Sequence, residues 1–344
     1  MKLIGIIGAS GYTGAELLRL VAGHPEMELA FATGDTQAGE LIGDLYPSLA
    51  AAHPRTRFEK YSPGLLAGVD GVFVALPHGH SQSLMGEILG SGVAVVDLGA
   101  DFRLPDPDSY ERWYGEPHSS PELLDTFAYG LTELYRDEIT SSRAVANPGC
   151  YPSAANLALA PLVRAGVIDP ASIIVNALSG VSGAGRPPKA NTTFCAADEN
   201  VGAYGLISHR HTAEIDLVLG ATALFTPHLV PMNRGILATC TARPTVSARD
   251  AGILTDQALL DVATDFYEAE PFVVVSQRSP STKATLGSNA VHITVRHDPR
   301  TDNVLAVAAL DNLTKGASGS ALQNMNLVLG LPETTGLSSI GVYP

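Results

Sequence analysis

The sequence predicts an α/β protein with a doubly wound N-terminal sheet and a second, α+β domain whose sheet is largely antiparallel. An apolar run of strand length, from Leu3 to Ile7, leads into a glycine-rich turn and then into an apolar helical segment. Strand-like and helix-like segments then alternate as far as residue 147, as they do around parallel sheets. Beyond residue 170, long strand patterns follow one another, which favours a separate domain.

Composition and charge narrow the class of protein. With 344 residues and 45% hydrophobic content, the chain is long enough for two buried cores. A net charge of -14 and the lack of any Lys or Arg run argue against nucleic acid or an anionic membrane as partner. Cys150, Cys195 and Cys240 are odd in number and far apart. That pattern is typical of a reducing cytoplasm and not of a disulfide framework or a zinc site, so no metal is expected. The N-terminal apolar run is too short for a signal peptide, and no run has membrane-spanning length.

The expected elements give a domain assignment. Strands are expected over 3–7, 27–33, 71–76, 93–98 and 144–146, with helices over 15–21 and 81–89. In the second half, strands are expected over 173–177, 224–230, 235–242, 271–275, 290–296 and 304–309, with helices up to 221 and over 254–269. A helix from Lys315 through Asn326 should return to the first part. The dinucleotide-binding domain is therefore predicted as 1–147 completed by 315–344, and the catalytic domain as 148–314. Residues 105–122, which include Trp113, show no clear period and are interpreted as a long ordered loop.

Three glycines punctuate the turn between the first strand and the first helix. Gly8 would make the tight turn, Gly11 would admit a pyrophosphate, and Gly14 would let the helix pack on the strand. The spacing is Gly-x-x-Gly-x-x-Gly and not the commoner Gly-x-Gly-x-x-Gly, so glycines that only close a βα turn are the alternative. Hydroxyls in this turn could bond to phosphate at the helix N-terminus. The predicted cofactor contacts here are Gly8, Ser10, Gly11, Tyr12, Thr13 and Gly14.

The segment after the second strand bears on the choice of dinucleotide. Gly34-Asp35-Thr36-Gln37 offers an acid, a hydroxyl and an amide with no arginine nearby. An acid at this place suits the ribose 2′-hydroxyl of NAD, whereas a base suits the 2′-phosphate of NADP. Taken alone the segment favours NAD, and a solvated turn residue is the other interpretation of Asp35.

Cys150 lies where a strand pattern gives way to an apolar helical segment, directly after Pro148-Gly149. At a helix N-terminus, unbonded N–H groups and the positive end of the helix dipole favour the thiolate form of a cysteine. The position therefore predicts a nucleophile. A buried structural cysteine is the alternative.

Arg103 follows the strand expected over 93–98, at the sheet edge where ligands bind in such folds. A guanidinium there could hold a phosphate or a carboxylate through two hydrogen bonds. A surface ion pair with Asp106 or Asp108 is an equally common use of an arginine. Later in the chain, the Gly-rich run over 179–186 could approach a cofactor closely.

Two histidines, His209 and His211, compete for the role of proton-transfer residue. The helical pattern that follows them buries one face, formed by Ile215, Val218, Leu219 and Thr222. His211 lies one turn before Ile215, which indicates a histidine near the core. His209 falls on roughly the opposite side, so helical phase predicts that His209 transfers the proton.

Six motifs carry a family resemblance that runs from end to end. They are GASGYTG at 8–14, NPGCYP at 147–152, SGVSGAGR at 179–186, HRHTAEI at 209–215, PHLVPMNRGI at 227–236 and KGASGSALQN at 315–324. With these motifs the chain resembles the N-acetyl-gamma-glutamyl-phosphate reductases, which are relatives of aspartate-semialdehyde dehydrogenase. NPGCYP together with HRHT is the specific part.

The resemblance implies a Rossmann-type first domain, a cysteine thioester, and NADP-dependent reduction of N-acetyl-L-glutamyl 5-phosphate to the 5-semialdehyde in arginine biosynthesis, with release of phosphate. Many members carry a Ser-Arg pair where this chain has Gly34-Asp35, so the resemblance and the local segment favour different dinucleotides. The residue roles implied are Cys150 as nucleophile, Arg103 and Arg210 as substrate contacts, and Ser182, Gly183 and Asn324 as cofactor contacts.

Three other functions remain open. Another acyl-phosphate reductase on the same scaffold would act on aspartyl phosphate or on a carrier-linked aminoadipyl phosphate. A cysteine hydrolase would also use a Cys with a distant His, although the glycine turn argues against it. A nucleotide-binding regulator would not need an intact Cys150. Gly- and Ala-rich helices and a large second sheet favour a homo-oligomer.

Overall fold

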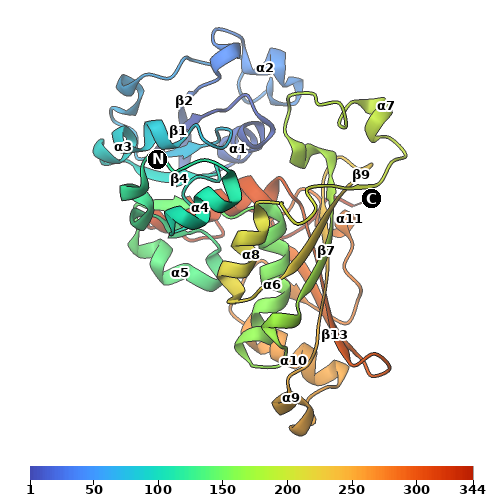
Figure 1. Ribbon diagram of the computed structural model, residues 1–344. Helices are drawn as coiled ribbons and strands as arrows, with labels where there is room; N and C mark the ends of the chain where they lie inside the picture. Colours follow the sequence, from blue (N-terminus) through green and yellow to red (C-terminus); the bar gives the residue numbers. More distant parts are fainter. Residues whose placement is uncertain (344) are drawn as a thin grey trace. The chain divides into compact units, whose positions relative to one another are not determined.

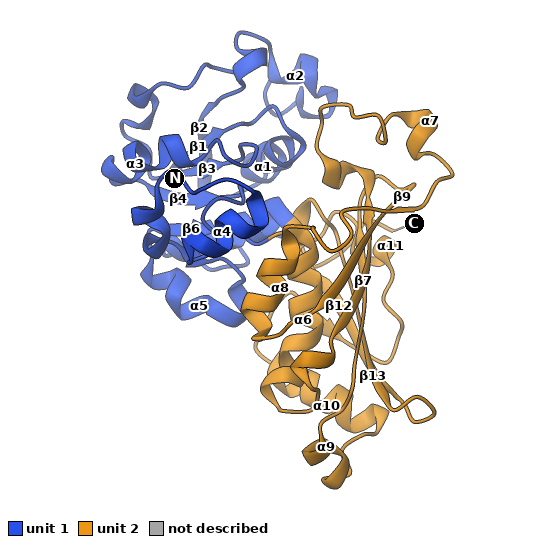
Figure 2. Ribbon diagram, viewed as in Figure 1, with its two compact units in different colours: residues 1–148, 317–337 blue, residues 149–316, 338–344 orange. Residues whose placement is uncertain are grey.

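The computed structural model describes residues 1–343, and these divide into two compact units (Figures 1 and 2). Unit 1 comprises Met1–Pro148 and Ala317–Leu337, and unit 2 comprises Gly149–Gly316 together with the chain from Ser338 onward. The C-terminal segment was expected to stay with the first domain, but after Leu337 it does not. Asn289 donates its N–H to the Ser338 carbonyl at 2.7 Å and Val342 donates to the Leu286 carbonyl at 2.7 Å, which ties this segment to unit 2.

Unit 1 is built on a six-stranded parallel sheet within the described residues, in the order β2-β1-β3-β4-β6-β5. This confirms the doubly wound N-terminal sheet. Its strands are β1 (Lys2–Ile7), β2 (Met27–Ala32), β3 (Gly71–Val74), β4 (Ala94–Asp97), β5 (Ala128–Tyr129) and β6 (Ala144–Ala146). Its helices are α1 (Tyr12–Ala22), α2 (Ile42–Leu45), α3 (Gln82–Gly90), α4 (Pro107–Tyr114), α5 (Thr132–Ser141) and α12 (Gly319–Val328).

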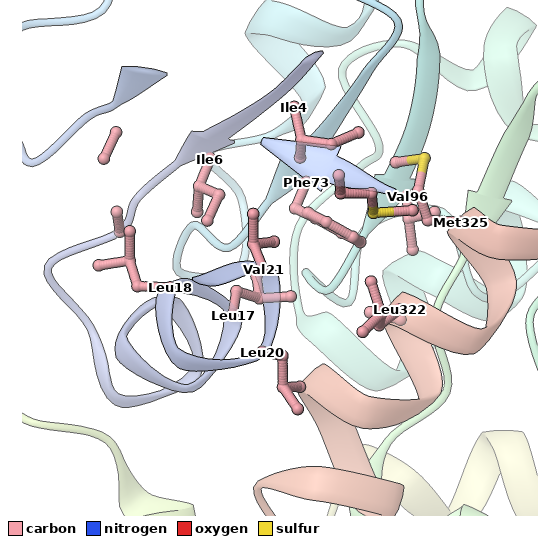
Figure 3. Packing of buried hydrophobic residues seen from close by; sticks show 14 of the residues in the cluster. Ile4, Ile6, Leu17, Leu18, Leu20, Val21, Phe73, Val96, Leu322 and Met325 are labelled. Atoms are coloured by element: carbon pink, nitrogen blue, oxygen red, sulfur yellow. The ribbon is translucent and has the colours of Figure 1, made fainter. Parts of the chain in front are cut away.

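The apolar face of α1 and the C-terminal helix α12 pack on one side of this sheet (Figure 3). Leu17 and Leu18 of α1 and Leu322 of α12 are fully buried beside strand residues such as Ile4 and Phe73. Continuous apolar strands are what a parallel sheet covered on both faces requires. Helix α12 is therefore part of the core of unit 1.

The interpretation of 105–122 as a loop is wrong. Residues Pro107–Tyr114 form α4, and a 3-10 turn follows at Pro121–Thr126. Asp106 caps α4 by accepting from the N–H groups of Asp108 and Ser109, Pro107 fits the first helical position, and Gly115 ends the helix at φ +80. These terminal signals specify the helix in a stretch too short and too polar to show apolar periodicity.

Unit 2 contains a seven-stranded mixed sheet within the described residues, in the order β11-β12-β13-β10-β7-β9-β8. The pairs β11·β12 and β7·β9 are parallel and the others are antiparallel, which agrees with the largely antiparallel sheet that was expected. The strands are β7 (Ile174–Gly180), β8 (Gly202–Ala203), β9 (Leu224–Val230), β10 (Ile236–Ala242), β11 (Val273–Val275), β12 (Val291–Asp298) and β13 (Asn303–Leu310).

Helix α6 (Cys150–Arg164) lies on β10 and β13, and α8 (His211–Leu219) packs on α6. Both helices are visible on the same side of the sheet in Figure 2. The remaining helices of unit 2 are α7 (Phe194–Ala197), α9 (Val246–Asp250), α10 (Asp256–Phe266) and α11 (Thr282–Thr285). A π turn, Thr314–Ser318, precedes α12 where one continuous helix from Lys315 was expected. Among residues 1–343, no helix has the length and apolarity needed to cross a membrane.

Candidate active site

Cys150 is the first residue of α6, with Gly149 as the N-cap in extended conformation. This is the strand-to-helix position that the sequence predicts. The following residues of α6 are almost entirely buried, so the helix is held firmly, and its first residue, Cys150, is partly exposed. Pro152 in the first turn has no N–H, so Cys150 and Tyr151 are the first two residues of α6 that carry backbone N–H groups.

Helix α8 holds the residue that precedes the thiol. The Glu214 carboxylate, fully buried, accepts the Gly149 N–H at 2.9 Å. His211 Nε2 lies 3.9 Å from Glu214 Oε1. A β-carbon built on Gly149 would stand 2.5 Å from His211 Nε2, so the ring packs directly on the backbone beside Cys150. The two side chains come from the same face of α8 because they are three residues apart.

His209 sits in an aromatic enclosure. Its ring meets Tyr151, Tyr204 and Phe225 edge-on at centroid distances of 5.7, 5.4 and 5.3 Å. Burial, and secondarily the charge of Arg210, lowers the pKa of His209 to about 4. Its Nδ1 accepts the backbone N–H of His211 at 3.2 Å. The ring is therefore neutral near pH 7 with its hydrogen on Nε2, which is a donor.

The two histidines do not lie on opposite sides of a helix, as helical phase predicts. His209 precedes α8 and is not helical, so the helix does not turn it to the opposite side. The His209 and His211 rings are 4.8 Å apart, and both contact Tyr151. His211 is partly exposed and not a core residue. Thr222, assigned to the buried face, is exposed beyond the end of α8 at Gly220.

We expect Gly149→Ala to lower kcat by roughly a hundredfold, because the added methyl must displace the His211 ring or the N-terminus of α6. Thermal unfolding should change far less than turnover. The matched control is Gly86→Ala, at a glycine of α3 with open space around it and no positive φ. If the Gly149 variant keeps full kcat, the contact between His211 and this backbone has no bearing on catalysis.

A second glycine, Gly316, packs closely against the side chain of Cys150. A β-carbon on Gly316, in the π turn, would lie 2.8 Å from Cys150 Cβ. That turn is fixed by the buried carboxylate of Asp311, which accepts the N–H groups of Leu313 and Thr314 at 2.9 and 3.1 Å. π turns inside helices are frequent at functional sites. Here the turn brings backbone without a side chain against the cysteine.

The loop predicted to contact cofactor is anchored within unit 2. Ser182 and Gly183 lie in a 3-10 turn, Val181–Ala184, after β7. The Asn312 amide donates to Ser182 Oγ at 3.0 Å, while Asn312 Oδ1 accepts the Gly235 N–H at 2.7 Å. Gly183 is needed because a β-carbon there would meet Ser179 Oγ at 2.9 Å.

In unit 1, the glycine turn has the geometry expected of a phosphate cradle. Gly8 has φ +83, and a β-carbon there would lie 2.5 Å from the Ala75 carbonyl, while Gly14 packs just as closely on Ala9. Gly11 has only the Gly8 carbonyl within 4 Å of such a β-carbon, so its surroundings are open. Gly11 is also the N-cap of α1, and no side chain caps that helix. The residues present therefore fit a dinucleotide pyrophosphate.

The neighbours of this turn are placed as follows. The backbone of Ser10 is held by Tyr46, whose hydroxyl donates to the Ser10 carbonyl at 2.8 Å. Tyr12 is 36% exposed at the start of α1, beside Thr13. Asp35 is exposed in a 3-10 turn after β2.

Two other predicted residues of unit 1 are buried. Arg103 is 8% exposed, and one of its guanidinium N–H groups donates to the Leu98 carbonyl at 2.9 Å. Asn324 is fully buried in α12, and its amide donates to Gly130 O and Asn147 Oδ1 at 2.8 and 3.0 Å. These bonds connect Asn324 to the residues that follow β5 and β6.

In unit 2, Arg210 is exposed directly before α8. Of the other cysteines, Cys195 is exposed, and burial raises the pKa of Cys240 to about 12. Among residues 1–343, no group of three or more His, Cys, Asp or Glu is placed to hold a metal ion.

Sequence reasoning missed Glu214 and Tyr204. The spacing of Glu214 from His211 in the HRHTAEI motif is a usable signal, since residues three apart in a helix share a face. Tyr204 donates its hydroxyl to Tyr151 at 3.1 Å, and Tyr151 donates to the His228 carbonyl at 3.0 Å. Burial raises the pKa of Tyr204 to about 12 and that of Tyr151 further. No local sequence pattern predicts the contact between Tyr204 and Tyr151, because these residues are far apart in sequence.

Two family models match the chain. Residues 3–142 match the NAD binding domain of semialdehyde dehydrogenase, and residues 150–312 match its dimerisation domain. Both match ranges agree with the architecture of the corresponding unit.

Curated relatives match along the whole chain. A protein of Desulforudis audaxviator named N-acetyl-gamma-glutamyl-phosphate reductase is 47% identical, with 100% of each chain covered. Proteins of the same name from Symbiobacterium thermophilum and Ectopseudomonas mendocina are 47% and 43% identical, with 99% and 100% of each chain covered.

Solved structures share the fold at low identity. Aspartate semialdehyde dehydrogenase II from Vibrio cholerae is 17% identical with a TM-score of 0.69, covering 96% of this chain and 99% of its own. Aspartate semialdehyde dehydrogenase with NADP from Candida albicans is 17% identical with a TM-score of 0.64 over 96% of this chain and 99% of its own.

Proposed function

The chain belongs to the N-acetyl-gamma-glutamyl-phosphate reductase family, and we propose that it reduces N-acetyl-L-glutamyl 5-phosphate to the 5-semialdehyde through a thioester on Cys150. The observation that carries this proposal is the thiol at the N-terminus of α6, beside two histidines, in a chain 47% identical over its full length to a reductase of that name. The activity fits a biosynthetic role in making arginine. Three cysteines present as thiols support a reducing cytoplasm as its location.

The first half of the reaction is acyl transfer to sulfur. The Cys150 thiolate attacks the acyl carbonyl, the bond from carbon to the phosphate oxygen breaks, and phosphate leaves. Arg103 is the proposed phosphate ligand, because a guanidinium can pair with two phosphate oxygens. The N–H groups at the start of α6 stabilise negative charge at the carbonyl oxygen.

The second half is reduction of the thioester. NADPH, when bound through the glycine turn of unit 1, supplies the hydride. The Nε2–H group of His209 donates a hydrogen bond to the oxyanion of the tetrahedral intermediate, which re-forms the carbonyl as the thiolate of Cys150 leaves, so the aldehyde is released without net proton transfer. This role replaces the proton transfer expected from the sequence, because Nε2 already carries the ring hydrogen. His211 and Glu214 hold Gly149, and so the cysteine, in place. Arg210 is proposed to bind a carboxylate of the substrate.

A substrate panel tests the function directly. In the reverse direction, N-acetyl-L-glutamate 5-semialdehyde with inorganic phosphate and NADP should give NADPH, and omission of phosphate should abolish it. Aspartate semialdehyde and aminoadipate semialdehyde should react at least a hundredfold more slowly in kcat/KM, roughly what a missing binding contact costs. A preference for either of these aldehydes would show that the protein is one of the other acyl-phosphate reductases. Ester or amide hydrolysis without dinucleotide would support a cysteine hydrolase.

We expect Arg103→Leu to raise the KM for phosphate in the reverse reaction by roughly ten- to a hundredfold, the worth of a charge-assisted hydrogen bond. The KM for NADP should change little. Arg143→Leu is the matched control, since Arg143 also lies in unit 1 and donates to a backbone carbonyl, that of Gly92. If the KM for phosphate is unchanged in Arg103→Leu, Arg103 does not bind phosphate and has only a structural role.

We expect NADPH to exceed NADH in kcat/KM, as in the family and against the exposed Asp35. A carboxylate beside the ribose repels a 2′-phosphate, so Asp35→Ser should widen the preference for NADPH. Steady-state kinetics with both dinucleotides measure the ratio. A preference for NADH that Asp35→Ser reduces would show that the acid after β2 selects NAD.

We also propose a homo-oligomer that uses the second sheet. The match of 150–312 to a dimerisation domain supports it. So does the sheet face opposite α6, where Ile174 and Leu224 are 40% and 55% exposed and pair with each other across β7 and β9. Exposed apolar side chains that adjoin on a sheet favour association.

A further inference from the structure

Unit 1 contains two fully buried carboxyl groups that the proposed chemistry does not use. Asp97 ends β4, and Asp101 follows four residues later in the turn that leads to Arg103. Both side chains have 0% exposure. A buried carboxylate without compensation is costly, so the hydrogen bonds of this pair decide which charges are present.

The hydroxyl of Ser81 joins the two groups. Ser81 Oγ lies 3.1 Å from Asp97 Oδ2 and 2.8 Å from Asp101 Oδ2. A hydroxyl has one hydrogen and can donate to only one of these oxygens. The other short contact is a hydrogen bond only if a carboxyl donates it. Both contacts are hydrogen bonds when one of the two carboxyl groups is protonated.

The two carboxyl groups differ in the number of hydrogen-bond donors that they accept from. The Gly79 N–H faces both oxygens of Asp101 at 2.8 and 3.0 Å, and the Tyr110 hydroxyl donates to Asp101 Oδ1 at 3.2 Å. Asp97 receives one N–H besides the Ser81 contact, from Gly99 at 2.9 Å. Donors stabilise the ionised form, so Asp97, which has fewer of them, is the better place for a proton.

Two histidines lie beside Asp101. His78 Nδ1 is 3.5 Å from Asp101 Oδ1, and its Nε2 is 3.6 Å from Glu116. His118 Nε2 contacts the backbone carbonyl of Asp101, at 2.9 Å. Burial raises the pKa of Asp97 to about 7; the charge of Asp101 acts in the same direction, while the Gly99 N–H, Ser81 and Arg103 oppose the rise.

We propose that protonated Asp97 is a positioning residue, which through Ser81 and Asp101 fixes the turn that presents Arg103. The Asp97 hydroxyl donates to Ser81 Oγ, and Ser81 donates to Asp101. At the same time Asp97 Oδ1 holds the Gly99 N–H, next to the Leu98 carbonyl that binds the Arg103 guanidinium. Ionisation of Asp97 leaves two buried carboxylates facing one hydroxyl and loosens that turn. The consequence for phosphate binding rests on the proposed function; the protonation itself does not.

The protonation is tested on the wild-type protein without substrate. Infrared difference spectra between about pH 5 and about pH 9, on protein labelled with carboxyl-¹³C aspartate, should show a protonated aspartyl carbonyl band that disappears with a midpoint near 7. The band should be missing from Asp97→Asn. Absence of any protonated aspartyl band near pH 6 in the wild type would overturn the proposal, whatever the enzyme reduces.

The positioning role is tested by the pH dependence of the KM for phosphate in the reverse reaction. Asp97→Asn keeps a neutral group that can donate to Ser81. The ratio of wild-type to variant KM, which cancels the ionisation of phosphate itself, should grow towards tenfold per pH unit above about 7. The KM for NADP should show no such trend. Asp70→Asn, at a half-exposed carboxylate 3.6 Å from Lys2, is the control and should follow the wild type.

The outcomes separate the two claims. If the infrared band of protonated Asp97 disappears with pH but the ratio of the KM values for phosphate does not change, the positioning role is refuted. The protonation of Asp97 would still stand. If no aldehyde gives phosphate-dependent NADPH, the proposed function fails, and the infrared experiment still decides the protonation. If Asp97→Asn does not fold, Ser81→Ala takes its place. Without the hydroxyl bridge it should show a raised KM for phosphate already at about pH 6, and an unchanged KM there would refute the role.

Discussion

Cys150→Ser is expected to lower kcat by about a thousandfold or more while dinucleotide binding is retained. A serine hydroxyl is a far weaker nucleophile than a thiolate, and the N-terminus of α6 stabilises an anion that serine does not supply near neutral pH. Steady-state turnover and dinucleotide titration by fluorescence measure the two parts. The glycine turn belongs to unit 1 and Cys150 to unit 2, so the substitution should not disturb the turn.

The other two cysteines provide controls. Cys195→Ser changes an exposed residue and should keep full activity. Cys240→Ala changes a buried residue of β10 and should mainly lower the melting temperature, because it leaves a small cavity. Inactivation by iodoacetate should persist in both variants and vanish with loss of Cys150. Inactivation that depends on Cys195 would assign the nucleophile elsewhere.

His209→Gln is expected to lower kcat by roughly a hundred- to a thousandfold with a small change in KM, the cost of losing a well-placed donor to an oxyanion. The wild-type rate should fall on the acid side near pH 4, where His209 takes up a second proton and loses the bond that Nδ1 accepts from His211. The variant should lack that limb. His211→Gln should keep more of kcat and lose stability instead, since the ring packs on Gly149.

The same pKa shift has a consequence for folding. The folded pKa of His209, about 4, lies below its unfolded value of 6.5. Between these values the unfolded chain binds more protons, so this group makes stability fall as pH drops from 6.5 towards about 4. Denaturant unfolding across that window should show a smaller fall in His209→Gln. If His211→Gln loses kcat while His209→Gln keeps it, the two roles are exchanged.

Local patterns were sufficient for much of the fold. The apolar run of β1 with Gly8 and Gly14 identifies the first βα unit, and the Pro148-Gly149 turn places Cys150 at a helix start. Helix α5 (Thr132–Ser141) was missed because charged and polar residues make up most of it and Tyr135 interrupts its helical backbone. Helix α4 was missed although Asp106 and Gly115 mark its two ends.

The site itself depends on packing that periodicity cannot supply. Helical phase separates His209 from His211, yet the structure brings their rings together because the chain before α8 is not helical. The approach of Gly316 to Cys150 joins residues from the two ends of unit 2. The contact of Ser81 with Asp97 joins the start of α3 to the end of β4. Such pairs follow from the order of strands in the sheet, which a single sequence does not reveal.

If Cys150 carries the acyl group, the enzyme should become acylated when it is mixed with N-acetyl-L-glutamyl 5-phosphate without NADPH. A rapid release of phosphate, equal to the number of active sites, should accompany acylation of the Cys150 peptide in the mass spectrum, and NADPH added afterwards should discharge it as the aldehyde. An acyl group on Cys195, or phosphate release that requires NADPH and leaves Cys150 unmodified, would contradict the mechanism.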